Sequence, residues 1–345
     1  WESVSGLMPT DSLGTSWAVR SADVSGDTIV VGTWTADDPG AYVFERSGSG
    51  SWSQVQELVP EDATTDGSFK GESRFGFSVA VSGTRAVVGA PGEQGLRDGW
   101  VYVFEKNGSG DWIEVEKVTN TLGSNNASHF GYSVAMSGDT AIVGQAGSPG
   151  QAHIIERVGI RTWEQIHLLR PTQTVDIYPN EFGRAVAISD EYALVGDRNT
   201  EVTTGLSYPY PAAADTGAVY VYERDAAGQW QESESDVLLA SDGANGDSFG
   251  YSVSVSGEYV VVGAPGEDQG IDYEDADSAD DSGAAYVFGL ETGGWREVAK
   301  LTQPTRVSGA EFGSAVAISG LTALVAAPFD DGQGTDSGSV FAFEN

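Results

Sequence analysis

Short apolar runs alternate with glycine-rich turns along the whole chain, and the same order of runs returns six times. The second copy shows it best, with runs over 75–81 and 85–90 joined by Ser-Gly, a third over 99–105, and a fourth that begins at Trp112. Each run has the length and the β-branched and aromatic content of a strand, with turn-forming residues at its borders. The pattern predicts four strands per repeat, which we denote A to D in chain order.

The links between strands A and B and between strands C and D are short enough to be hairpins, so successive strands are expected to be antiparallel neighbours. Strands A and B hold small or branched residues, as at 79–81 and 86–88, which suits strands buried on both faces. Strand D alternates tryptophan with charged and amide residues, which is typical of an outer edge that must not pair with another chain.

Two landmarks mark the repeats, a serine in the A–B hairpin and a tryptophan at the start of strand D. The serines are Ser25, Ser82, Ser137, Ser189, Ser256 and Ser319, and the tryptophans are Trp1, Trp52, Trp112, Trp163, Trp230 and Trp295. The repeats therefore span about 8–58, 59–118, 119–169, 170–239, 240–301 and, for the last, 302–345 together with 1–7.

The last repeat reaches strand C at 338–344 and contains no tryptophan after it, whereas Trp1–Leu7 has the sequence of a strand D. We therefore expect Trp1–Leu7 to complete the last sheet. Four-stranded antiparallel sheets repeated around an axis and closed in this way form a β-propeller. The sequence thus predicts an all-β fold, a six-bladed β-propeller formed as a single domain over 1–345. An open β-solenoid is the alternative, and it would leave Trp1–Leu7 unpaired.

Phe-Gly pairs and Gly-Ala-Pro triplets recur at matching places in the repeats. The pairs begin at residues 75, 130, 182, 249 and 312, and the triplets cover 89–91 and 263–265. With these motifs the chain resembles the FG-GAP repeat of integrin α-subunit propellers and of microbial surface proteins. The resemblance covers nearly the whole chain and implies the propeller fold and a place at a surface.

The chain also departs from that family. Trp17-Ala18 stands where the first repeat should have Phe-Gly, and Ala326 replaces the glycine of the last triplet. Integrin-type repeats carry a calcium loop between strands A and B, whereas the A–B links here are too short to wrap a cation that takes six to eight oxygens. Integrin propellers have seven blades, and we count six. The calcium role is therefore not transferred to these links.

Acidic residues number 51 and basic residues 17, for a net charge of −34. This charge disfavours nucleic acid and direct insertion into an anionic membrane as partners. A solvated acidic coat of the kind that halophiles use explains acids spread over the whole length, and carboxylates gathered around cations are the alternative. There is no cysteine, so a disulfide or a thiolate metal site is excluded.

Function is expected on the B–C loops, because binding residues concentrate on loops held by a rigid scaffold. The three longest B–C loops belong to the neighbouring repeats four, five and six. They carry the candidates for contact with a surface glycan or protein: Arg198, Tyr208, Tyr210 and Tyr273. In the B–C loop of repeat four, which we call loop four, prolines next to Tyr208 and Tyr210 restrict the backbone. Aromatic side chains held in this way lose little conformational entropy on contact with a ligand. The alternative is that these rings fold back as a lid over the blades.

Acidic residues are concentrated in the B–C loops of repeats five and six, which we call loops five and six. Two interpretations are open: the carboxylates form a non-standard Ca²⁺ site, or they are simply solvated. The candidate ligands are Asp272, Glu274, Asp275, Asp277, Asp280, Asp281, Asp330, Asp331 and Asp336. No glycine stands at the sixth place of a loop begun at Asp275, so the EF-hand template is not met. The D–A stretch 242–247 is a fainter candidate. Asn107 and Asn126 lie in N-glycosylation sequons.

Catalysis has little support, because the chain has three histidines and no nucleophile elbow, zinc-protease motif or phosphate loop. We expect a non-catalytic recognition or adhesion module, extracellular or on a cell or virion surface of a halophile. The first alternative is a structural subunit of a surface or viral assembly, in which copies of the chain contact one another. The second is a glycan-active enzyme such as a glycoside hydrolase, which needs only two carboxylates at the right separation.

The acidic coat predicts that stability rises with salt. Dilution of salt leaves the self-repulsion of the negative charges unscreened, so the melting temperature should fall between molar and millimolar NaCl. Thermal unfolding followed by circular dichroism over that range tests this expectation. A melting temperature that does not change with salt would contradict it.

Overall fold

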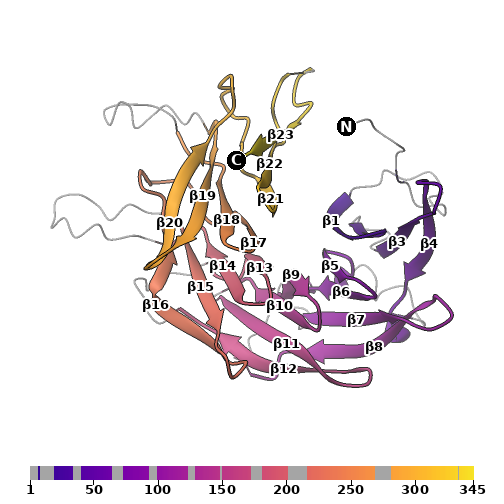
Figure 1. The fold of residues 1–345 in the computed structure, drawn as a ribbon. Helices are drawn as coiled ribbons and strands as arrows, with labels where there is room; N and C mark the ends of the chain where they lie inside the picture. The colour runs from indigo at the N-terminus through magenta and orange to yellow at the C-terminus, as the bar shows by residue number, and fades with distance from the viewer. Residues whose placement is uncertain are drawn as a thin grey trace. The chain divides into compact units, whose positions relative to one another are not determined.

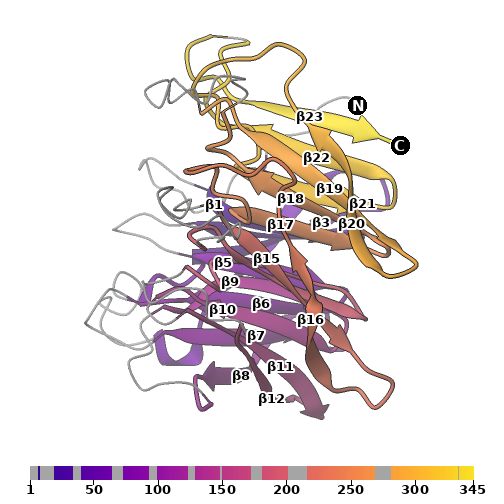
Figure 2. The same cartoon turned by 90° about the vertical axis from the view of Figure 1, so that its left-hand side faces the viewer.

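The structure is a computed structural model. It describes residues 7, 19–33, 40–63, 73–92, 99–122, 129–147, 150–171, 181–200, 216–268, 281–332 and 334–345. These residues fall into two compact units, one of Trp1–Gly147 with Gln151–Leu168 and one of Ser148–Gly150 with Leu169–Asn345. Each unit holds three antiparallel sheets, which we call blades one to six in chain order (Figures 1 and 2).

The first unit contains blades one to three. Blade one consists of β1 (Val19–Ser25), β2 (Thr28–Thr33), β3 (Gly40–Arg46) and β4 (Trp52–Leu58). Blade two consists of β5 (Ser78–Ser82), β6 (Arg85–Ala90), β7 (Trp100–Lys106) and β8 (Trp112–Thr119), and a 3-10 turn, η1 (Glu61–Ala63), precedes it. Blade three consists of β9 (Phe130–Ser137), β10 (Thr140–Gln145), β11 (Gln151–Gly159) and β12 (Thr162–Leu169).

The second unit contains blades four to six. Blade four consists of β13 (Ala185–Ile188), β14 (Tyr192–Asp197), β15 (Ala218–Arg224) and β16 (Trp230–Leu238). Blade five consists of β17 (Ser252–Ser256), β18 (Tyr259–Ala264), β19 (Ala284–Glu291) and β20 (Gly294–Leu301). Blade six has three strands among the described residues: β21 (Ala315–Ser319), β22 (Thr322–Ala327) and β23 (Ser339–Glu344).

In every blade the strands pair in chain order with antiparallel partners, as the hairpin-sized links predict. The prediction of an all-β chain built from six propeller blades is confirmed. The fourth strand of blade six was assigned to Trp1–Leu7, and apart from Leu7 this segment lies outside the described residues. No helix in the described part of the chain is long and apolar enough to span a membrane.

Aromatic side chains fill the space between successive blades within each unit. Phe75 of the first Phe-Gly pair is 1% exposed, and its ring stands edge-on to the rings of Tyr102 and Phe104 in strand C of its own blade. Trp112 at the start of strand D joins the same cluster, which also holds Leu58 of the preceding blade. Because each cluster takes residues from two blades, the hydrophobic core holds neighbouring sheets together.

In four Phe-Gly pairs the glycine, namely Gly76, Gly131, Gly250 or Gly313, lies directly against the backbone of the preceding blade. A Cβ atom added to Gly76 would lie 2.0 Å from the carbonyl oxygen of Gly40, and one added to Gly32 would lie 2.0 Å from that of Gly76. Gly76 also has a φ of +89°, a conformation that L side chains rarely adopt. The same contact recurs for Gly89 with Gly131, Gly196 with Gly250, and Gly263 with Gly313.

Serine side chains add hydrogen bonds to these backbone contacts. The Ser78 hydroxyl donates to the Gly131 carbonyl at 2.8 Å, and the Ser252 hydroxyl donates to that of Gly313 at the same distance. At the other end of strand A, the hydroxyl of the hairpin serine Ser82 accepts from the N–H of Gly138 at 3.0 Å. The Ser-Gly hairpin is therefore also a link between blades, which its sequence did not indicate.

Leu7 contacts blade one in the way that Leu58 contacts blade two. It packs on the cluster of Tyr42, Phe44 and Trp52, whereas Leu58 packs in the cluster that holds the equivalent rings of the next blade. Leu58 ends a strand D, and Leu7 stands six residues after a tryptophan as Leu58 does. The position of Leu7 thus agrees with the place predicted for the end of a strand D.

The close contact predicts that Gly76→Ala is far more damaging than an alanine at a glycine with open space. The new methyl group would overlap the Gly40 carbonyl and also strain a positive φ, so the free energy of unfolding should fall by roughly 3 kcal/mol or more. Gly83→Ala is the matched control, since Gly83 has a φ of +58° but no atom within 4 Å of the added Cβ. It should cost about 1–2 kcal/mol from backbone strain alone.

Urea titrations of both variants measure this difference. Equal losses of stability for Gly76→Ala and Gly83→Ala would contradict a role for the close contact between blades.

Candidate functional site

Of the four predicted ligand-binding residues, one lies in the described part of the chain and three lie outside it. Arg198 is described and follows the end of β14, whereas Tyr208, Tyr210 and Tyr273 lie outside the described residues. The Arg198 guanidinium forms an ion pair with Glu181 and lies over the ring of Tyr251, with its central carbon 5.1 Å from the ring centroid. Arg198 is thus held in place at the start of loop four.

Four of the predicted calcium ligands are described. Asp330 is 6% exposed and accepts hydrogen bonds from Gln303 Nε2 at 3.2 Å and from the Ser339 hydroxyl. Asp331 accepts from the backbone N–H of Asp336 at 2.8 Å. Asp281 is the fourth. The other five, Asp272, Glu274, Asp275, Asp277 and Asp280, lie outside the described residues.

Asp330 and Asp331 therefore order the backbone of loop six. In the described part of the chain, no group of three acidic or histidine side chains is placed to hold a metal ion. Of the two asparagines in N-glycosylation sequons, Asn107 is described and Asn126 lies outside the described residues. The Asn107 side chain caps the C–D turn of blade two and accepts from the N–H groups of Ser109 and Asp111 at 2.8 and 3.0 Å.

Each of the three long B–C loops is closed at its base by a hydrogen bond between its two ends. The carbonyl of Thr200 accepts from the N–H of Gly217 at 3.1 Å in loop four, and the carbonyl of Glu267 accepts from Gly283 at 3.0 Å in loop five. In loop six the carbonyl of Asp330 accepts from Gly338 at 3.0 Å. Compact loops with closed ends of this kind are frequently functional.

The closed bases of loops four and five are also tied to the next blade. The N–H of Phe249 donates to the carbonyl of Thr216 at 3.1 Å, and the N–H of Phe312 donates to that of Ser282 at 3.0 Å. Both acceptors stand two residues before strand C, so the Phe-Gly pair of the following blade fixes where each loop re-enters its sheet. The loops of repeats four and five thus rise from positions that neighbouring blades set.

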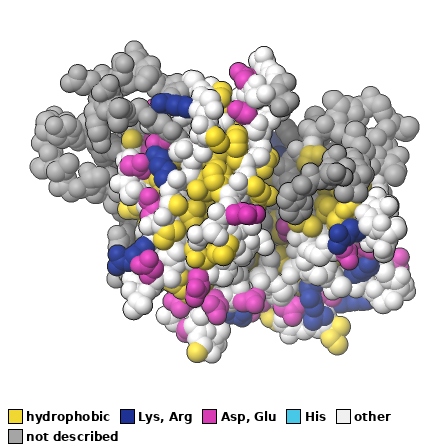
Figure 3. All heavy atoms as spheres, turned by 45° about the horizontal axis from the view of Figure 1, so that its top comes forward, with side chains coloured by type: hydrophobic (Ala, Val, Ile, Leu, Met, Phe, Trp, Pro, Cys, Tyr) yellow, Lys and Arg dark blue, Asp and Glu magenta, His cyan; other side chains and the backbone are white. Residues whose placement is uncertain are grey.

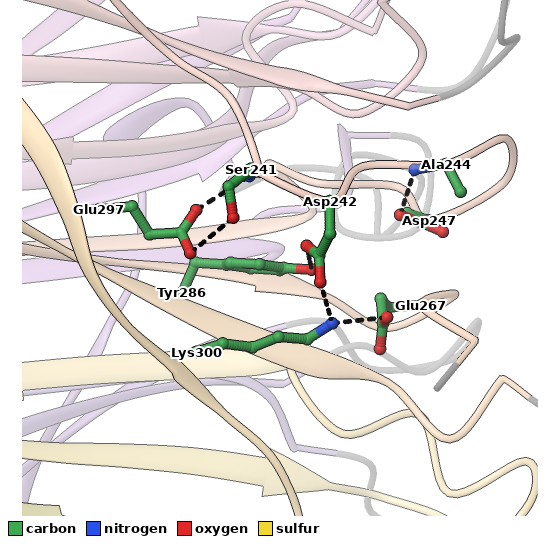
Figure 4. Close-up of polar contacts among 8 residues, drawn as sticks. All are labelled: Ser241, Asp242, Ala244, Asp247, Glu267, Tyr286, Glu297 and Lys300. Atoms are coloured by element: carbon green, nitrogen blue, oxygen red, sulfur yellow. Dashed lines mark hydrogen bonds and ion pairs between the residues drawn. The ribbon is translucent and has the colours of Figure 1, made fainter. Parts of the chain in front are cut away.

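A cluster of charged side chains, of which Glu267 is the most buried, lies at the base of loop five (Figure 4). Lys300 on β20 donates to Asp242 at 2.7 Å and to Glu267 at 2.6 Å, and the Tyr286 hydroxyl donates to Asp242 at 2.8 Å. Glu297, also on β20, accepts from the N–H of Ser241 at 2.9 Å. Strand D of blade five therefore clamps the D–A loop before it and the base of loop five together.

Blade two contains the same clamp. Asp62 accepts from the Tyr102 hydroxyl and the Lys117 ammonium, and Glu114 accepts from the N–H of Glu61 at 2.7 Å. Two of the four lysines in the chain stand at this one position, Lys117 and Lys300, which is the sequence signal that could have revealed the clamp. In the stretch 242–247, considered above for calcium, Asp242 accepts from the Lys300 ammonium.

Blade five has a buried acid at a position where blade two has a serine. Asp247 is 2% exposed, where blade two has Ser73, and its carboxylate accepts from the N–H of Ala244 at 2.6 Å. Burial, followed by the charge of Glu267, raises the pKa of Asp247 from 3.8 to about 7. Burial opposes the charge of Lys300, but its bonds to Asp242 and Glu267 outweigh burial and raise the pKa of its ammonium.

The cluster thus holds more carboxyl groups than Lys300 can neutralise. Its side chains form hydrogen bonds and ion pairs with one another, and these hold the D–A loop and the base of loop five in place. We find in it no group placed to attack a substrate, among the residues that the structure describes. Figure 3 shows acidic side chains dispersed over the described part of one face of the molecule rather than gathered in one spot.

Comparison with known proteins supports the fold more than any activity. The model of the FG-GAP repeat matches residues 52–104, 112–153, 233–288 and 295–343. Among solved structures, a protein described as a putative 6-phosphogluconolactonase from Bacteroides uniformis is similar, with a TM-score of 0.58 and 13% identity over 96% of this chain and 82% of that chain. At this identity the likeness shows the fold alone. No curated protein matches.

The raised pKa of Asp247 predicts that protein stability falls between about pH 4 and pH 7. The folded protein keeps this proton up to about pH 7, whereas the unfolded chain releases it near pH 3.8. The contribution of Asp247 is therefore fully present below pH 3.8 and is lost as the pH rises to about 7. Asp247→Asn carries no charge and can still accept from Ala244, so it should stabilise the protein at pH 8 by roughly 2–4 kcal/mol.

Urea unfolding at pH 5 and pH 8 measures this effect. Glu258→Gln, which changes an exposed acid of the same blade, is the control and should leave the difference between the two pH values unchanged. A loss of stability in Asp247→Asn at pH 8 would show that the ionised carboxylate stabilises the fold, so that folding does not raise its pKa.

Proposed function

The chain belongs to the FG-GAP repeat family, and from this premise we propose that it is a non-catalytic recognition module of the cell exterior. It binds a surface glycan or a surface protein through the B–C loops of blades four to six. FG-GAP repeats are typical of extracellular proteins, which supports this location. One propeller architecture hosts many activities, so the proposal depends on the loops rather than on the fold.

The observation that carries the proposal is the closed base shared by the three longest B–C loops. The residue three places after the end of strand B, namely Thr200, Glu267 or Asp330, accepts from the glycine that precedes strand C. Long segments inserted at such a base leave the hydrogen bonds of the sheet intact. These loops can therefore vary in sequence for binding without loss of the scaffold.

The residues at the base of loop four support contact with a polar ligand. Arg198 lies between Glu181 and the Tyr251 ring, which orients a guanidinium at the start of the loop that carries Tyr208 and Tyr210. Aromatic rings and an oriented guanidinium are common recognition groups for sugar rings and for protein surfaces.

Replacement of residues 201–215 by a short Gly-Ser link tests the proposal. We expect the wild-type protein to bind, as a monomer, at least one probe on an array of immobilised glycans or on a panel of extracellular protein domains. The loop variant should lose that binding by tenfold or more, because the aromatic residues leave with the loop, while its melting temperature stays unchanged.

The matched control replaces the C–D hairpin 107–111 of blade two by a Gly-Ser link of equal length, and it should bind as the wild type does. Binding that survives removal of loop four would contradict the assignment of the site. Turnover of an oligosaccharide on the array would contradict a non-catalytic role.

A further inference from the structure

The clamp of blades two and five has an uncharged counterpart in blade three. Gln165 stands two residues after the strand D tryptophan, as the clamp glutamates of blades two and five do, and its side-chain oxygen accepts from the N–H of Thr121 at 2.8 Å. His153 stands on strand C where those blades have a tyrosine, and Leu122 and Leu168 stand at the positions of the clamp aspartate and lysine. Of these four side chains of blade three, that of His153 is the one that titrates.

The His153 ring is fully buried, and a side-chain amide faces each of its two nitrogens. Gln165 Nε2 donates to Nδ1 of the ring, and Nε2 of the ring donates to Gln145 Oε1 at 3.2 Å. Gln145 Oε1 also accepts from Asn120 Nδ2 at 2.7 Å. The ring of Phe130 stands edge-on to the imidazole, with centroids 5.1 Å apart and planes at 75°. These bonds join strands B, C and D of blade three to the start of its D–A loop.

A backbone N–H group sets the direction of these hydrogen bonds. Because the N–H of Thr121 can only donate, the atom of Gln165 that faces it is the amide oxygen, and the NH₂ group therefore faces Nδ1 of His153. The Thr121 hydroxyl donates to the same oxygen at 3.1 Å. Nδ1 is thus the unprotonated nitrogen of the ring and Nε2 carries the proton. The imidazole is neutral in this arrangement.

A second proton on the imidazole would find no acceptor at Nδ1. Two N–H donors would then face one another, and Gln165 could offer its oxygen to the imidazolium only by turning it away from the N–H of Thr121. The groups that face the ring from β9, β10 and β12 are uncharged, namely Phe130, Gln145 and Gln165, and so do not compensate a buried positive charge. The groove that Gln165 and Thr121 line also holds three charged side chains that are partly or largely exposed to solvent: Glu116, Lys117 and Glu164.

We propose that His153 makes the attachment of the D–A loop in blade three sensitive to acid. At neutral pH, Gln165 connects the ring to Thr121. When His153 gains a proton, one of the two bonds of Gln165 is lost, and the start of the loop at Thr121 is released. The D–A and B–C loops lie at the same end of a blade, because its strands are antiparallel in chain order. Acid therefore loosens the end of blade three that carries its loops.

The sign of the effect on stability follows from proton linkage. An imidazole in an unfolded chain gains its proton near pH 6.5, whereas the folded protein keeps His153 neutral below that value. The stabilising contribution of the network is therefore fully present above about pH 6.5 and is lost as the pH falls. This dependence is opposite to the one that the buried Asp247 produces.

Hydrogen exchange at the Thr121 amide tests the proposal in the full chain. After correction for the intrinsic exchange rate, the protection of this amide should fall by about tenfold or more between pH 7 and pH 5 in the wild type. In His153→Gln, an amide that does not titrate replaces the imidazole, so the protection should change little over the same range. Unchanged protection in the wild type, or an equal fall in both proteins, would overturn the proposal.

Gln165→Glu gives a result of opposite sign. A carboxylate at this position can accept both from the N–H of Thr121 and from a protonated His153, so the protection of Thr121 should stay constant or rise from pH 7 to pH 5. A fall like that of the wild type would contradict the mechanism. Nitrogen-15 NMR of the imidazole signal that is missing in His153→Gln should show the neutral Nε2–H tautomer at pH 7. An Nδ1–H tautomer or an imidazolium at that pH would show that the proposal is wrong.

Discussion

The close contact between the glycine of a Phe-Gly pair and the backbone of the preceding blade, seen at Gly76, Gly131, Gly250 and Gly313, is the constraint on which the other features depend. Gly76 and Gly32 interlock so tightly that a single carbon atom added to either would overlap a carbonyl oxygen. Because the backbones meet, the phenylalanine beside each such glycine reaches into the space between blades, and the neighbouring serine hydroxyl reaches a carbonyl of the next blade. Within each unit, backbone geometry thus places a blade against its neighbour, and side-chain packing adds stability.

The same contact positions the regions that we assign to recognition. Loops four and five return to their sheets at residues that hydrogen-bond to the Phe-Gly pair of the following blade. The lysine clamp of blade five then ties a D–A loop to the base of loop five, beside the buried Asp247, whose pKa burial raises. In such a scaffold the strands maintain the fold. The loops with closed bases can then determine the specificity of binding.

Most of the fold could be predicted from the sequence, because strand length, turn residues and the six recurring tryptophans each report local backbone geometry. Long-range contacts could not be predicted, since they join residues some 55 positions apart: the bond of Ser82 to Gly138 and the ion pair of Asp62 with Lys117 have no local pattern. For the site, Arg198 and the calcium candidates of loop six were located, but Asp330 proved to order its own loop. The buried environment of Asp247 could not be predicted, because burial arises only when three separate segments meet.

A crystal structure that resolves the carbonyl oxygens of blades four to six is the most direct test of the backbone contact. We predict that Gly250 and Gly313 adopt φ values near +90° to +100°, with a carbonyl of the preceding blade where a Cβ would stand, as in Ala218 with Gly250. Glycines with ordinary negative φ, or a gap wide enough for a methyl group at these positions, would contradict the view that backbone contact sets the arrangement of successive blades.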